Sequence, residues 1–112
     1  MLAAYRLKRG VSLFMSPEIE KILEVVCMVY RAFGLDVVIT SGVDGPHREN
    51  SLHYNFRAID IRKNFESPLA AAGWMIHHEK ILDGMEQNFQ KRKYPVLIVE
   101  EQDHIHLEWC AQ

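Results

Sequence analysis

The stretch RAIDIR, residues 57–62, alternates isoleucine with small or charged residues. Because the side chains of a strand point alternately to the two faces of a sheet, Ile59 and Ile61 share one face and Asp60 lies on the other. The stretch therefore predicts a strand that packs on the core through its isoleucines and presents an aspartate on the opposite face. Directly before it, the segment SLHYNF, residues 51–56, places His53 seven residues ahead of Asp60.

A second polar cluster near the C-terminus, DHIHLEW at residues 103–109, shows the same alternation. In a strand from residue 104 to 109, one face would carry His104, His106 and Glu108, and the other Ile105, Leu107 and Trp109. The apolar run PVLIVE, residues 95–100, predicts a further strand. The short connection at residues 101–103 favours a hairpin of these two strands.

Two helices are predicted by their start signals and periodicity. Ser16-Pro17-Glu18 provides an N-cap hydroxyl, a proline at the first helical position and an acid in the first turn, and Gly34 is a natural end. Ser67-Pro68 repeats the start signal for a helix toward Lys91, which Asp83-Gly84 could bend or split. The apolar residues expected to place this second helix on the core are Leu69, Ala72, Trp74, Met75, Ile76, Leu82, Met85 and Phe89.

These elements predict a single domain over residues 1–112 of the α+β class. Residues 1–15 are expected to form an extended arm with at most one short strand. Residues 36–40 predict a strand and residues 41–50 a polar loop. The expected fold is a small antiparallel sheet of about four strands, with two main helices packed on its apolar face and the candidate site on the other.

Composition limits the classes of partner. Apolar residues make up 48% and charged residues 25%, which is ordinary for a globular domain. The net charge of −2 gives no basic surface for nucleic acid. No apolar run reaches the ~18 residues of a membrane span, and the N-terminal region has no signal-peptide core. We therefore expect a soluble chain made in the cytoplasm, which reaches the bacterial cell wall only if another protein releases it.

The polar residues of the two clusters suggest a zinc site. A catalytic zinc ion needs three protein ligands and an open position for water, and histidine and carboxylate are suitable ligands. His53 from the loop, Asp60 from its strand and His106 from a neighbouring strand could supply them. Two polar faces that meet on one side of a sheet would leave buried groups unpaired unless a metal bound them. The sequence therefore predicts Zn²⁺ as the cofactor.

If the predicted zinc site serves peptide hydrolysis, it also needs a base. This base takes the proton of the attacking water and returns it to the leaving amine. Asp103, at the turn that enters the strand of His106, is the first candidate. Glu100 and Glu101 are the alternatives. His104 would lie on the same face as His106, where it could donate to a developing oxyanion or orient the base.

The pattern Ser-x-His-x-x-x-x-Ala-x-Asp at residues 51–60, followed by Asp-His-x-His at residues 103–106, resembles the zinc D-alanyl-D-alanine peptidases and the related phage cell-wall endopeptidases. This group shares its metal-site architecture with the Hedgehog signalling domain. The resemblance covers residues 38–109, and the segment at residues 39–42 resembles the one before the family's site. It implies zinc ligation by His53, Asp60 and His106, a catalytic carboxylate at Asp103 and a site histidine at His104.

The chain departs from the family pattern at two places. Phe56 stands where the family usually has glycine, and Val43-Asp44 follow Ser-Gly where many members carry an arginine that binds a substrate carboxylate. The nearest arginine is Arg48, which with Ser51 and His47 forms the set of candidate substrate contacts. His47 could equally face water.

The resemblance implies zinc-dependent hydrolysis of peptide bonds in peptidoglycan stem peptides or cross-links, as in a phage endolysin. Three alternatives stay open. They are a D-alanyl-D-alanine carboxypeptidase, a zinc-binding module of the same fold without turnover, and a metal-free phage structural protein. The sequence does not distinguish which peptide bond such an enzyme would cleave.

Overall fold

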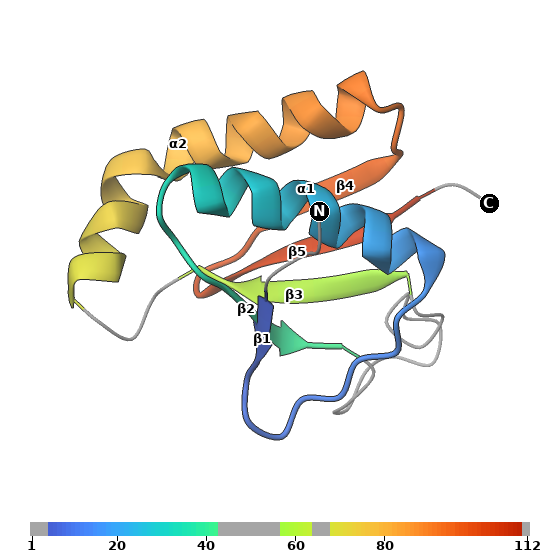
Figure 1. Cartoon of the computed structure of the whole chain (residues 1–112), viewed down its shortest axis with the longest axis horizontal. Helices are drawn as coiled ribbons and strands as arrows, with labels where there is room; N and C mark the ends of the chain where they lie inside the picture. Colours follow the sequence, from blue (N-terminus) through green and yellow to red (C-terminus); the bar gives the residue numbers. More distant parts are fainter. Residues whose placement is uncertain (1–4, 43–56, 64–67, 111–112) are drawn as a thin grey trace.

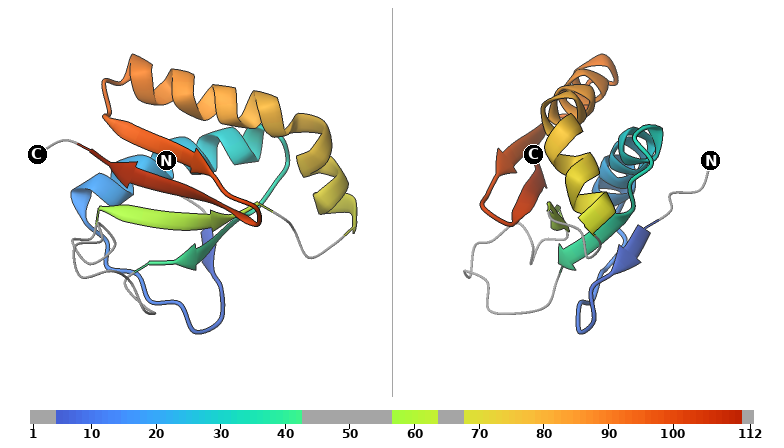
Figure 2. Two further views of the ribbon diagram at one scale, coloured as in Figure 1. Left: turned by 180° about the vertical axis from the view of Figure 1, so that it is seen from behind. Right: turned by 90° about the vertical axis from the view of Figure 1, so that its left-hand side faces the viewer.

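The computed structural model describes residues 5–42, 57–63 and 68–110. In chain order, the elements are β1 (Tyr5–Leu7), α1 (Pro17–Ala32), β2 (Val37–Ser41), β3 (Ala58–Arg62), α2 (Pro68–Lys91), β4 (Val96–Glu100) and β5 (His104–Trp109). The strands form one sheet in the order β1-β2-β3-β5-β4. Both helices lie on the same side of this sheet (Figures 1 and 2). The predicted α+β class, with two helices on one face, is confirmed.

The strand prediction was incomplete at the N-terminus, because β1 makes the sheet five-stranded within the described residues. β1 pairs with β2 in parallel, while the other three pairs of neighbouring strands are antiparallel. The sheet is therefore mixed and not purely antiparallel. The link between the parallel strands is α1, since a parallel pair needs a long crossover connection.

Helix α1 begins and ends where the sequence predicts. The Ser16 hydroxyl accepts a hydrogen bond from the backbone N–H of Ile19 at 3.2 Å, which satisfies one of the free donors of the first turn. Gly34 has a φ of 70°, a left-handed conformation that glycine adopts without steric cost. One stripe of α1 is buried against the sheet and α2: Ile19, Ile22, Leu23, Val26, Val29 and Tyr30.

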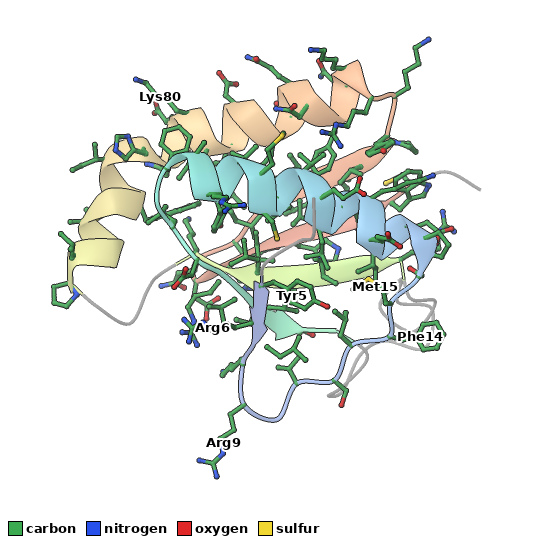
Figure 3. The ribbon with its side chains drawn as sticks, in the orientation of Figure 1. Tyr5, Arg6, Arg9, Phe14, Met15 and Lys80 are labelled. Atoms are coloured by element: carbon green, nitrogen blue, oxygen red, sulfur yellow. The ribbon has the colours of Figure 1, made fainter. Side chains whose placement is uncertain are left out.

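The segment between β1 and α1 runs past the end of β2. A Cβ atom at Gly42 would collide with the backbone carbonyl oxygen of Ser12, so this close approach requires glycine. Arg9 and Phe14 extend outward from the same segment (Figure 3). The glycine that follows β2 therefore has a packing role.

Helix α2 is one continuous helix, without a break at Asp83-Gly84. Its first turns run at an angle to the rest (Figure 1). The core prediction for this part was wrong for Leu69, Met75 and Ile76, which are 85%, 74% and 74% exposed, and Ala72 is also exposed.

The buried stripe of α2 consists of Trp74, Ile81, Met85 and Phe89. At 100° per residue, Ile76 projects about 160° away from Trp74 around the helix axis. The helix therefore has two apolar stripes, of which only one meets the core. Leu82 is partly buried beside it.

Candidate functional site

The two predicted clusters meet in the middle of the sheet. β3 and β5 are antiparallel neighbours, and Asp60 lies directly opposite His106 although 46 residues separate them. The next pair on the same face is Arg62 with His104, and the preceding one is Ala58 with Glu108. We call this side the polar face, made up of Asp60, Arg62, His104, His106 and Glu108.

His106 is held by a carboxylate at each ring nitrogen. Its Nδ1 lies 2.8 Å from Oδ1 of Asp60, and its Nε2 lies 2.9 Å from Oε1 of Glu108. The side chains of Asp60 and His106 are only 16% and 21% exposed. The hydrogen bond to Asp60 raises the pKa of His106, burial opposes this, and the bond to Glu108 adds to the rise. Both partners are carboxylates, which accept hydrogen bonds, so each of them favours a proton on the ring nitrogen that it faces.

His104 belongs to the same row but contacts a different carboxylate. Its Nδ1 lies 2.7 Å from Oδ1 of Asp103, and its Nε2 lies 3.8 Å from Oδ2 of Asp60, beyond hydrogen-bonding distance. Acid and imidazole groups thus alternate along the polar face from Asp103 to Glu108. Such an arrangement can bind a cation or hold protons at defined atoms.

Asp103 lies in the predicted turn between β4 and β5. The backbone N–H of Glu101 donates to the carbonyl of His104, which closes this hairpin, and the backbone N–H of Lys63 donates to the carbonyl of Asp103. The Asp103 side chain is 80% exposed. Its hydrogen bond to His104 lowers the pKa of the carboxyl, so Asp103 is ionised at neutral pH.

The two alternative bases are placed differently. Glu100 lies opposite Ile105 in the register of β4 and β5, so it belongs to the face away from His106. Its carboxylate also forms an ion pair with Lys63 at 2.7 Å. Glu101 is exposed in the turn itself. Of the three candidates, Asp103 has the closest connection to the polar face.

The structure places two of the three predicted zinc ligands, Asp60 and His106, in direct contact. Zinc–ligand distances of about 2.0–2.2 Å in a tetrahedron place two ligand atoms about 3.3 Å apart. The 2.8 Å between Nδ1 of His106 and Oδ1 of Asp60 is a hydrogen-bond distance and is shorter than this spacing, so both atoms would have to move apart to bind one ion. Within residues 5–42, 57–63 and 68–110, no group of three His, Cys, Asp or Glu side chains is arranged to hold a metal ion. The third predicted ligand, His53, lies outside these ranges.

The prediction of unpaired buried groups on the polar face was wrong. The polar face was expected to contain unpaired buried groups that only a metal could satisfy. In the described part of the chain, no buried side-chain nitrogen or oxygen lacks a hydrogen-bond partner. Asp60, His106 and Glu108 satisfy one another, so the polarity of this face does not by itself require a metal.

The predicted substrate contacts His47, Arg48 and Ser51 also lie outside the described residues, as does Phe56. The structure brings together Asp60, Asp103, His104 and His106, and it adds Glu108, to which the sequence analysis gave no role. The signal for Glu108 was present, since a residue two positions after His106 in a strand lies on the same face.

No family model, no curated protein and no solved structure matches the chain. In the described part of the chain, no helix combines the length and the apolar character needed to cross a membrane.

Proposed function

We propose that the chain is a zinc-dependent peptidase that hydrolyses peptide bonds in the stem peptides or cross-links of bacterial peptidoglycan. The observation that carries the proposal is the direct pairing of Asp60 with His106 across β3 and β5, at 2.8 Å. These residues belong to the two motifs that resemble the zinc D-alanyl-D-alanine peptidases. We propose His53 as the third ligand and the cell wall as the place of action, as for a phage endolysin.

Zinc, when bound, supplies a Lewis acid that polarises a carbonyl and favours ionisation of water. The chain's own residues would do the rest. Asp103 is ionised and exposed, so it can accept a proton from water and return it to the leaving amine. His104, held by Asp103, would orient this carboxylate or donate to the oxygen on which charge develops.

A zinc-binding module without turnover is the second candidate. It is favoured by the hydrogen bond between Asp103 and His104, which lowers the pKa of the carboxyl and so makes Asp103 a weaker base. The two candidates differ in whether Asp103 is needed for bond cleavage.

The test is release of new amino groups from purified peptidoglycan by the zinc-loaded protein, with mass analysis of the fragments. Asp103→Ala should lower the rate by about 10²–10⁴-fold and leave the zinc content unchanged. Glu101→Ala, in the same turn, is the matched control and should keep the rate. If zinc-loaded wild-type protein releases no amino groups, the peptidase proposal fails. If only Glu101→Ala loses the rate, Asp103 is not the base.

A further inference from the structure

Glu108 contacts the predicted zinc ligand His106 from the side opposite Asp60. It lies two residues after His106 on β5, and its Oε1 is 2.9 Å from Nε2 of the ring. Its cross-strand neighbours are apolar, Ala58 on β3 and Leu97 on β4. The Glu108 side chain is mostly buried, which makes a carboxylate there costly unless it has a partner. The ring of His106 is that partner.

The two nitrogens of His106 therefore have separate partners. Nδ1 faces Asp60, its proposed co-ligand, and Nε2 faces Glu108. A histidine that binds a metal must offer a lone pair on one nitrogen and carry its proton on the other. A carboxylate at the second nitrogen fixes this tautomer and the orientation of the ring.

We propose that Glu108 is a positioning residue that keeps the proton of His106 on Nε2, so that Nδ1 offers its lone pair beside Asp60. This inference rests on the proposed zinc site. The second oxygen of Glu108, Oε2, lies 4.0 Å from the thiol sulfur of Cys110 and leaves Oε1 to the ring. The side chain thus acts on the metal through His106, without itself being one of the proposed ligands.

The test combines zinc affinity with the tautomer of His106. Zinc affinity is measured by competition with a chromophoric chelator for the wild type and for Glu108→Ala, Glu108→Gln and Glu101→Gln. Glu108→Ala should weaken zinc binding about 10- to 100-fold. Glu108→Gln keeps a carbonyl oxygen that can accept from Nε2 and should lose less. Glu101→Gln removes the same charge from the exposed turn and should bind zinc as the wild type does.

The ¹⁵N shifts of the His106 ring in the zinc-loaded wild type give a result that depends on no variant. A proton on Nε2 and a metal-bound Nδ1 support the proposal. A proton on Nδ1, or a Glu108→Ala protein that binds zinc as tightly as the wild type, overturns it while leaving the zinc site intact. If the wild type binds no zinc, the proposed function itself fails and this inference with it.

Discussion

The two faces of the β3–β5 pair differ in chemistry although they come from the same two strands. The core face carries the cross-strand pairs Ile59–Leu107 and Ile61–Ile105, all fully buried. On the polar face, Asp60 lies opposite His106, and both keep some contact with solvent. Strand alternation therefore assigns the stability of the domain and the chemistry of the candidate site to separate residues. Substitutions on one face can therefore be tested against substitutions on the other.

The largest expected effect on stability is on the core face. Leu107→Ala should lower the free energy of unfolding by about 2–5 kcal/mol, because it removes a fully buried side chain and leaves a cavity. Urea-induced unfolding of the zinc-free protein measures it. His104→Ala, on the polar face of the same strand, is the control and should cost clearly less, because Asp60 keeps its hydrogen bond to His106. Equal losses for the two variants would mean that the faces do not divide stability and chemistry as we infer.

The second-largest effect is expected from the polar face, as a dependence of the free energy of unfolding on pH. The partners of His106 raise its pKa in the folded state above the ordinary value of about 6.5. Their stabilisation is therefore fully present below about pH 6.5 and is lost as the pH rises through the folded-state pKa. The zinc-free protein should lose stability over this range, by an amount on the order of 1 kcal/mol.

The Asp60→Asn variant tests which group causes this pH dependence of stability. It keeps the shape of the side chain but removes the carboxylate whose hydrogen bond is the largest cause of the raised pKa of His106. Thermal unfolding between pH 6 and pH 9 should therefore show a flatter dependence for Asp60→Asn than for the wild type. Identical slopes in both proteins would assign the pH dependence to another group.

The smallest effect is expected where the polar face reaches the edge of the sheet. Leu97, on β4 opposite Glu108, is 47% exposed. Leu97→Ser should change the free energy of unfolding by no more than about 0.5 kcal/mol. A larger loss in urea unfolding would show that an apolar residue on this face contributes to the core, against the division described above.

Much of the central sheet could be predicted from the sequence. The alternation in residues 57–62 and 104–109 identifies both strands, and with them the faces of Asp60 and His106. The cross-strand register could not be predicted, because it depends on how separate segments pair. For the same reason, the sequence only suggested the strand β1. Its three residues form a strand because they pair with β2.

The wrong predictions arose where one residue pattern is compatible with two different structures. Leu69 and Ile76 have helical spacing, but periodicity does not reveal which of two apolar stripes meets the core. The expectation of unpaired polar groups failed because carboxylates and imidazoles can satisfy one another. That is the reason Glu108 received no role from the sequence, although it is the second partner of His106.

The zinc content of the purified protein tests most directly whether the polar face is a metal site. Wild-type protein and His106→Ala are loaded with zinc, dialysed and analysed by inductively coupled plasma mass spectrometry. We predict about one zinc ion per wild-type chain and only traces in the variant. A wild-type chain without zinc, or equal zinc content in both proteins, would contradict the assignment of Asp60 and His106 as metal ligands.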